Sequence, residues 1–253
     1  ATSSSCSWRM ASCTAIAAWC FVPEGHSLEL LARRLEPLVG CRVTAGPLSG
    51  SRVTAVEAHG KHLLVHGDRG RSLTVHLGMN GRVRVTEPGR GWGPAVLRTP
   101  ACDVVITGTR RIAERPTRRA APALGPDLLH GRFSAVEYLR RARLVERPVC
   151  EALLDQRVLA GIGNIVRCEV LWEAGQDPFQ PVSAMSDRAL LELAVRARRQ
   201  LRRGVERRGR LTSHVHRRAG RPCPRCRSPI ESKMQGEQPR VLYWCPGCQA
   251  PAG

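Results

Sequence analysis

Four cysteines near the end of the chain have the spacing of a metal site. They form two Cys-X-X-Cys pairs separated by eighteen residues, and they are Cys223, Cys226, Cys245 and Cys248. Each pair can close a tight knuckle that directs two sulfur atoms at one ion, and four thiolates are a common ligand set for structural zinc. The sequence therefore predicts one bound Zn²⁺, with two disulfide bonds as the alternative. The other cysteines lack regular spacing and are not expected to be ligands.

A glycine-rich segment in the second half of the chain is the other candidate for chemistry. It reads Ala-Gly-Ile-Gly-Asn over residues 160–164 and lies between two segments with helical periodicity. Two glycines permit a sharp turn and the close approach of another molecule. Asn164 would begin the second helix, where free N–H groups and the helix dipole attract anions. The segment is suited to gripping a DNA phosphate, or it is an ordinary turn between helices with an asparagine cap.

The charge of the chain favours nucleic acid as its partner. Lys and Arg total 40 against 21 Asp and Glu, which gives a net charge of +19 over 253 residues. Most of the basic residues are Arg, whose guanidinium makes paired hydrogen bonds to phosphate. Compositional bias would explain Arg over Lys, but it would not explain the net excess. No stretch is long and apolar enough to span a bilayer, so no membrane partner is expected.

The elements that must position these residues fall into successive groups. Residues 23–112 open with a helix that has Leu28, Leu31, Leu35 and Leu38 on one face. Period-two strands then predict an antiparallel sandwich or barrel. These strands are expected at 53–58, 62–66, 72–77, 82–85, 96–98 and 103–106. Residues 113–127 are predicted to be a linker, residues 128–212 a helical domain and residues 213–253 a zinc finger. A long helix is expected from Asp187 to Arg203, ending at Gly204, with an arginine-rich face that either is solvated or faces DNA.

Four stretches of the chain occur in an order that is typical of one enzyme family. They are Pro-Glu-Gly-His at 23–26, Gly-Lys-His-Leu-Leu at 60–64, the segment 153–164 and the cysteine module with residues 240–249. With these motifs the chain resembles the formamidopyrimidine-DNA glycosylase and endonuclease VIII family of base-excision repair enzymes. The resemblance implies an α+β fold: an N-terminal β-sandwich domain, a helical domain with a helix–two-turn–helix, and a β-hairpin zinc finger. It also implies a monomeric, cytoplasmic, nucleoid-associated DNA glycosylase with AP lyase activity. Its partner would be double-stranded DNA containing damaged bases or abasic sites.

The resemblance implies roles for individual residues. Pro23 matches an N-terminal proline whose nitrogen attacks the sugar carbon once the damaged base has left the stack. Glu24 matches the carboxylate that handles protons at the sugar. Lys61 matches a phosphate contact and proton donor in β-elimination. Arg240 matches a zinc-finger arginine that grips the flanking phosphate and assists δ-elimination, and Asn164 matches a phosphate-binding asparagine.

Two loops and the last motif indicate the branch of the family. Met79, within residues 76–81, matches a residue that fills the gap left by the extruded base, with a buried turn methionine as the alternative. The segment 109–113 lacks the Phe-Gly of the Arg-Arg-Phe-Gly motif that the formamidopyrimidine branch carries. This absence, with Tyr-Trp-Cys-Pro at 243–246, favours the endonuclease VIII branch, whose substrates are oxidised pyrimidines and abasic sites. An 8-oxopurine glycosylase is the alternative.

Residues 1–22 match nothing in this family, and they bear directly on the chemistry. A proline within a chain is a tertiary amide, which is neither basic nor nucleophilic. A free N-terminal amine is partly unprotonated at neutral pH. Val22 is the residue that an alternative GTG start codon would encode. We therefore expect residues 1–22 to be a mis-assigned start or a cleaved segment, so that the working protein begins at Pro23. The alternative is a catalytically silent paralogue that binds DNA lesions.

Overall fold

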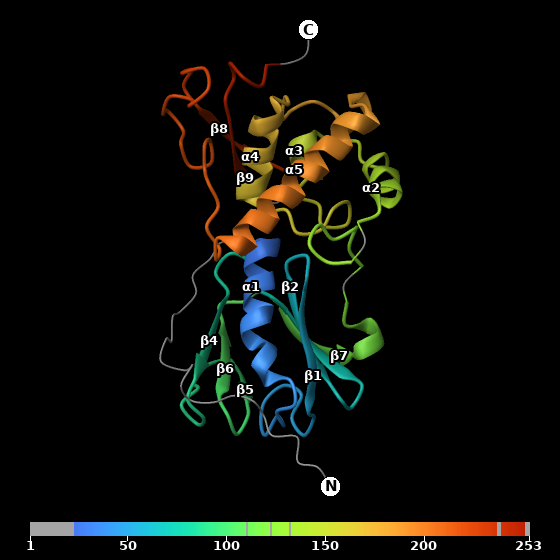
Figure 1. Cartoon of the computed structure of the whole chain (residues 1–253), viewed down its shortest axis with the longest axis vertical. Helices are drawn as coiled ribbons and strands as arrows, with labels where there is room; N and C mark the ends of the chain where they lie inside the picture. The colour runs from blue at the N-terminus through green and yellow to red at the C-terminus, as the bar shows by residue number, and fades with distance from the viewer. Residues whose placement is uncertain (1–22, 110, 122, 132, 237–238, 251–253) are drawn as a thin grey trace. The chain divides into compact units, whose positions relative to one another are not determined.

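The computed structural model describes residues 23–109, 111–121, 123–131, 133–236 and 239–250 (Figure 1). The predicted extension, residues 1–22, lies outside these ranges. The chain divides into two compact units: unit 1 contains Pro23 and Ser27–Pro122, and unit 2 contains Glu24–His26 and Ala123–Gly253. Among the described residues, no helix combines the length and the apolar character needed to cross a bilayer.

Unit 1 consists of two antiparallel sheets. One has the order β1-β2-β3-β7 and the other the order β4-β6-β5. The strands are β1 (Val53–His59), β2 (His62–Gly67), β3 (Arg71–His76), β4 (Arg82–Thr86), β5 (Ala95–Arg98), β6 (Asp103–Thr107) and β7 (Arg111–Pro116). The six strands expected from the period-two pattern are confirmed, each to within one residue at either end. The neighbours β1–β2, β2–β3 and β5–β6 are consecutive along the chain and are joined by short connections, whereas β3 pairs with β7 and β4 with β6.

Alternate residues of both sheets enter one apolar core. Leu73 and Val75 of β3 meet Val104 and Ile106 of β6 in the same buried cluster. The helix α1 (Gly25–Leu35), with the short 3-10 helix η2 (Glu36–Leu38) after it, adds Leu28, Ala32, Leu35 and Leu38. Burying each large aliphatic side chain contributes about 1.5–3 kcal/mol. The apolar face predicted for this helix is therefore the face that packs.

Strand β7 occupies part of the segment predicted to be a linker. Residues 113–116 pair with β3, from Thr74↔Ala113 to Arg71↔Pro116, and the 3-10 helix η3 (Thr117–Arg119) follows. Glu114 binds Arg71 at 2.5 Å and accepts a hydrogen bond from the Leu48 N–H at 3.1 Å. The linker prediction is wrong here because β7 is an edge strand. Such strands carry charges and proline, and their composition resembles that of a linker.

Unit 2 is mainly helical and ends in a hairpin. Its elements are α2 (Ala135–Ala142), α3 (Val149–Ala152), α4 (Asn164–Ala174), η4 (Val182–Ala184), α5 (Asp187–Glu206), β8 (Glu231–Gln235) and β9 (Arg240–Trp244). Ser186 caps α5 by accepting a hydrogen bond from the Ala189 N–H at 3.2 Å. Helix α5 does not end at Gly204 as predicted. It continues past this glycine, whose missing side chain leaves room for the ring of His26.

Helix α4 lies at the centre of unit 2. It packs against α3, α5 and β9, and its residues from Val166 to Trp172 are all buried. This run includes Arg167 and Glu169, neither of which is exposed to solvent. A helix that is buried on all sides must satisfy such polar groups within the protein. The partners of Arg167 include Asn164 and the Val241 carbonyl, which belong to the site described below.

Candidate active site and metal centre

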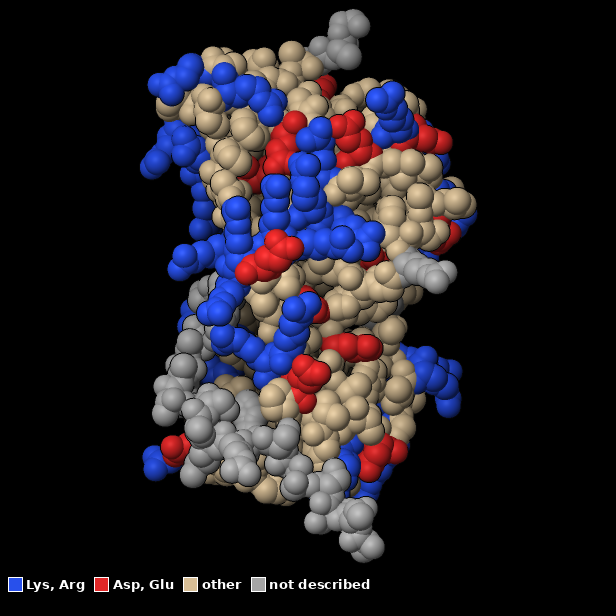
Figure 2. All heavy atoms as spheres, in the orientation of Figure 1, with Lys and Arg blue, Asp and Glu red and all other residues tan. Residues whose placement is uncertain are grey.

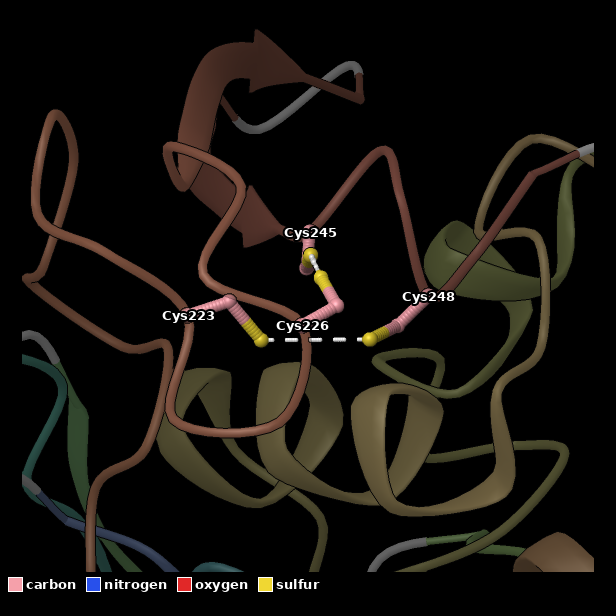
Figure 3. Close-up of side chains that lie close together, drawn as sticks. All are labelled: Cys223, Cys226, Cys245 and Cys248. Carbon is pink, nitrogen blue, oxygen red and sulfur yellow. Dashed lines mark hydrogen bonds between the residues drawn. The ribbon is translucent and has the colours of Figure 1, made fainter.

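The four cysteines converge at the base of the β8–β9 hairpin (Figure 3). Their sulfur atoms all lie within 4.8 Å of one another. The Cys223–Cys248 and Cys226–Cys245 sulfur pairs are 3.8 and 3.3 Å apart, and none of the four forms a disulfide. A tetrahedral ion with zinc–sulfur bonds of about 2.3 Å would hold its ligands about 3.8 Å apart. The predicted cluster is confirmed, and its geometry and sulfur donor set fit one zinc ion.

Donors from α4 and from the first knuckle surround one of these sulfurs. The Trp172 indole N–H and the Arg225 backbone N–H each donate to the Cys223 sulfur at 3.4 Å. The Arg225 guanidinium lies over the Trp172 ring at 4.5 Å from its centroid. Donors of this kind orient and stabilise a metal-bound thiolate. The cysteine cluster is thus built against α4.

Glu24 lies at the N-terminus of α4. Its side chain is fully buried, and its carboxylate accepts hydrogen bonds from the Ile165 N–H at 2.7 Å and the Val166 N–H at 3.4 Å. The sequence predicts that free N–H groups here would attract a DNA phosphate. The structure corrects this, because the anion at these two N–H groups is the protein's own carboxylate. The glycine joint therefore fixes a catalytic candidate in place.

The glycines of the joint are required by this arrangement. Gly161 has a φ of +104°, and its carbonyl accepts a hydrogen bond from the Gly25 N–H at 2.9 Å. A β-carbon at Gly163 would come within 2.3–2.5 Å of three atoms of the Glu24 side chain. The Gln156 amide bridges the turn, accepting from the Gly161 N–H at 3.0 Å and donating to the Ile162 carbonyl at 3.0 Å. Any side chain at position 163 would displace the carboxylate.

Asn164 connects the joint to the hairpin. Its Nδ2 donates to the Val241 carbonyl of β9 at 2.9 Å, and its Oδ1 accepts from the Arg167 guanidinium. Arg167 also donates to the Val241 carbonyl at 3.3 Å. An amide Nδ2 carries two hydrogens, and the bond to Val241 uses one of them. Sequence analysis missed Arg167, although a lone basic residue within the apolar run from Ile165 to Trp172 was a usable signal.

Arg240 opens β9 at the tip of the hairpin. It is half-buried, and its guanidinium donates to the carbonyl of its neighbour Pro239 at 3.1 Å. Within the described ranges no carboxylate pairs with it. Directly opposite Arg240 in the strand register, the Gln235 amide donates to Glu151 of α3 at 2.7 Å. The hairpin is thus anchored on α3 at the same end at which Arg240 lies.

Two predicted residues lie in turns of unit 1. Lys61 occupies the two-residue turn between β1 and β2, and Met79 lies between β3 and β4 with 65% of its surface exposed. The exposure excludes the alternative of a buried turn methionine. The connection from β6 to β7 contains only residues 108–110, and Arg110 lies outside the described residues. This short turn agrees with the missing Phe-Gly motif.

A row of imidazoles beside Lys61 was not anticipated. The strand register pairs His59 with His62, His62 with His76, and His76 with Arg111. The rings of His62 and His76 have centroids 4.7 Å apart. Burial, and next the charge of His76, lower the pKa of His62 to about 4. Burial, Lys61 and Arg111 lower the pKa of His76. At neutral pH both rings are therefore neutral neighbours of the Lys61 ammonium.

Pro23 lines a pocket in unit 1. The pocket holds about 390 Å³ of space that opens to solvent. Its walls include Leu77 and Gly81, which flank Met79 along the chain. The other lining residues are Ser27, Leu31, Arg34 and Val83. Within unit 1, the proline is thus next to the turn that carries the predicted wedge.

The arginines of α5 gather on one face of the molecule, as Figure 2 shows over this helix. Two of them are paired: Arg196 with Glu192, and Arg199 with Glu173 at 3.2 Å. The others on the outer part of the helix include Arg198, Arg202 and Arg203. The predicted basic face is therefore present, and the protein neutralises part of its charge.

Comparison with known proteins agrees with this geometry. Residues 124–215 match the formamidopyrimidine-DNA glycosylase H2TH domain, and residues 42–122 match the formamidopyrimidine-DNA glycosylase N-terminal domain. The probable endonuclease 8 2 of Streptomyces coelicolor is 36% identical over 199 residues, which are 69% of this chain and 71% of that protein. A DNA-(apurinic or apyrimidinic site) lyase of Mycolicibacterium smegmatis is 39% identical over 153 residues, 56% of this chain and 59% of that protein.

Solved structures show the same fold. The MutM (Fpg) protein of Thermus thermophilus superposes with a TM-score of 0.76 at 28% identity, covering 91% of this chain and 100% of that one. The two matching domains lie in the order that the sequence motifs predict, and the cysteine cluster follows them. The chain therefore belongs to the formamidopyrimidine-DNA glycosylase and endonuclease VIII family of DNA-repair enzymes.

Proposed function

We propose that this protein removes oxidised bases, chiefly pyrimidines, from double-stranded DNA and then cleaves the strand at the resulting abasic site. The observation that carries the proposal is the position of Glu24. This carboxylate directly follows Pro23, is fully buried, and is held by two N–H groups at the start of α4. Such a fixed carboxylate beside a proline suits proton transfer at a sugar that the proline attacks. The protein would act as a cytoplasmic, nucleoid-associated monomer.

The proposed chemistry begins at the Pro23 nitrogen. As a free secondary amine, this nitrogen attacks C1′ of the damaged nucleotide, the bond from C1′ to the base breaks, and the base leaves with a proton. Glu24 exchanges a proton with the sugar during ring opening, which yields an iminium between Pro23 and the opened sugar. The N–H groups of Ile165 and Val166 stabilise the carboxylate form of Glu24, so it can act as a proton acceptor.

Strand cleavage then needs positively charged or hydrogen-bond-donating groups at the two phosphates that leave. Lys61 supplies an ammonium in the β1–β2 turn, and Asn164 and Arg240 supply donors at the joint and the hairpin. Successive β- and δ-elimination expel the 3′ and 5′ phosphates, which positive groups stabilise as leaving anions. Met79 would fill the space that the extruded base vacates, a task suited to an exposed apolar side chain.

Zinc has a structural role in this proposal. One Zn²⁺ would be bound by the four cysteine sulfurs of Cys223, Cys226, Cys245 and Cys248. It would cross-link the two knuckles at the base of the hairpin. A site with four protein ligands leaves no open position for substrate. The four cysteines would thereby fix the hairpin that carries Arg240 at its tip.

The preference for pyrimidines rests on the missing Phe-Gly motif and on the relative named endonuclease 8 2. An 8-oxopurine glycosylase remains the second candidate, since the domains that match carry the formamidopyrimidine-DNA glycosylase name.

The deciding experiment is borohydride trapping on three duplexes that contain an abasic site, an oxidised pyrimidine or 8-oxoguanine. We expect a chain that begins at Pro23 to form a covalent adduct with the first two. Glu24→Gln in the same chain should reduce adduct formation on the oxidised pyrimidine. Tight binding to abasic DNA without any adduct would identify a lesion-binding protein that lacks lyase activity. An adduct formed chiefly with 8-oxoguanine would identify the purine-specific branch.

A further inference from the structure

Trp92 is the most exposed large apolar side chain in the described part of the chain. It lies between β4 and β5 in unit 1, and 88% of its surface is open to solvent. Tryptophan has a large apolar ring that proteins usually cover in part. Exposed aromatic side chains are enriched where a protein binds a partner. The surroundings of Trp92 indicate what that partner is.

The loop that carries Trp92 is held by hydrogen bonds to a buried carboxylate. Asp103 of β6 is fully buried, and its carboxylate accepts hydrogen bonds from the Gly91 N–H at 2.9 Å and from Arg98 at 2.8 Å. Arg98 also donates to the Gly91 carbonyl at 2.9 Å. A charge-assisted network of this kind is geometrically specific. It fixes the backbone immediately before Trp92.

Two glycines allow the loop to pack closely against β6. A β-carbon at Gly91 would lie 2.7 Å from the Asp103 β-carbon and 3.0 Å from a Val105 methyl group. A β-carbon at Gly93, whose φ is +152°, would lie 3.1 Å from the other Val105 methyl group. Val105 is only 1% exposed as a result. Because Gly91 and Gly93 both pack against β6, the indole of Trp92 between them is the part of the loop that projects into solvent.

The loop lies on the outer face of the β4-β6-β5 sheet. Val104 and Ile106 of β6 enter the core of unit 1, so the intervening Val105 lies on the opposite face. Arg84 of β4 is exposed and stands directly opposite Val105 in the register. Arg90, in the loop itself, is exposed. It forms an ion pair with Glu87, with 3.4 Å between the Arg90 Nε and a Glu87 carboxylate oxygen. The face thus combines a projecting indole with guanidinium groups.

The geometry points to a binding surface for single-stranded nucleic acid, formed by Trp92, Arg84 and Arg90. We infer that a base stacks on the indole while the arginines contact the phosphates on either side, the combination that single-strand binders use. An acidic peptide would satisfy the arginines but would present no flat ring to the indole. The surface lies on a sheet face, whereas Lys61 and Met79 lie in turns at strand ends. It would hold an unpaired strand independently of the excision chemistry.

The test measures the affinity of the full chain for a fluorescent oligo-dT of about 12 nucleotides, a length within the usual site size. Trp92→Ala should weaken binding about 5- to 150-fold, because stacking of one base contributes roughly 1–3 kcal/mol. Trp92→Phe keeps an aromatic ring and should stay within about threefold of the wild type. Arg84→Gln should weaken binding and flatten its dependence on salt.

Val136→Ala is the matched control, because Val136 is another apolar residue with 79% exposure, on α2 of unit 2. It should leave oligo-dT affinity unchanged. Thermal stability of each variant and its excision of a duplex lesion should also stay at the wild-type level. Unchanged oligo-dT affinity in Trp92→Ala would overturn the inference. So would a Trp92→Ala defect confined to an oligo-glutamate peptide, since that result would assign the surface to an acidic protein.

Discussion

The glycine joint and the tip of the β8–β9 hairpin both lie in unit 2 and both carry predicted DNA contacts, yet they are held in different ways. In the joint, Glu24 and Asn164 each have at least two partners within the protein. At the tip, Arg240 is half-exposed and donates only to its neighbour's carbonyl among the described residues. Backbone and side-chain bonds fix the joint. The hairpin is held by the four cysteines at its base and by hydrogen bonds at Gln235 and the Val241 carbonyl, while the Arg240 side chain is bound only locally.

The difference indicates that the joint and the hairpin tip have separate roles, one in catalysis and one in DNA binding. Glu24 occupies the N–H groups at the start of α4, so those groups are not available to a phosphate. We therefore propose that the Asn164 amide and the half-exposed guanidinium of Arg240 contribute phosphate contacts at unit 2. Changes at Glu24 and at the glycine that supports it should therefore reduce catalysis with little loss of binding, and changes at Arg240 should do the reverse. The following variants test this division, beginning with the largest effect.

Cys245→Ser should have the largest effect, because it removes one ligand from the sulfur cluster. Structural zinc contributes on the order of 10 kcal/mol to the folding of small zinc modules. We expect loss of the metal, disorder of the hairpin and loss of DNA binding, measured by metal analysis and by filter binding. Cys102→Ser is the control, since Cys102 is a buried cysteine in unit 1. Folded, active protein that contains no zinc would contradict the assignment.

Gly163→Ala should reduce excision almost as far as Glu24→Gln does. The new methyl group would come within 2.3–2.5 Å of the Glu24 side chain and would push the carboxylate from its two N–H partners. Loss of a positioned proton-transfer group lowers rates by about 10²- to 10⁴-fold. Single-turnover excision should fall by that order in both variants, while the affinity for abasic-site DNA stays within a few-fold. Full excision by Gly163→Ala would show that the carboxylate position does not limit the reaction.

The joint also shows how far sequence analysis reaches. The turn, the helix after it and the cysteine cluster follow from local patterns: two glycines, an apolar period and paired Cys-X-X-Cys spacing. The partner of the α4 N-terminus does not, because Glu24 is about 140 residues away along the chain. The buried Arg167 and the row His59, His62 and His76 depend in the same way on long-range packing and strand register. Strand β7 was missed because edge strands and linkers share a composition.

His26 anchors the segment that carries Glu24, and it should make the joint sensitive to acid. Its ring packs on Gly204 of α5, and burial lowers its pKa to about 4 from the ordinary 6.5. The unfolded chain therefore takes up a proton below about pH 6.5, whereas the folded protein does not until about pH 4. Stability is full above pH 6.5 and falls as the pH drops through this window, by about 3 kcal/mol in total.

His26→Leu should remove this contribution. Urea midpoints at pH 7 and pH 4.5 should differ less in the variant than in the wild type. A residual difference is expected, because burial also lowers the pKa values of His62 and His216 to about 4. Equal acid sensitivity of variant and wild type would show that His26 is protonated without cost in the folded protein.

Arg240→Ala should have the smallest effect of these variants, and it should weaken DNA binding without slowing base excision. Loss of one phosphate contact reduces the slope of log affinity against log salt by about one, and it weakens binding by about tenfold at moderate salt. Arg221→Ala is the matched control, because Arg221 is an exposed arginine of the same module that lies outside the hairpin. Fluorescence anisotropy on abasic-site DNA at several salt concentrations measures both slopes. Single-turnover base excision at saturating enzyme should remain close to wild type in Arg240→Ala, since Glu24 and its partners are untouched. If instead excision falls at saturation while the salt slope is unchanged, Arg240 acts on the reacting nucleotide, and the division between joint and hairpin fails.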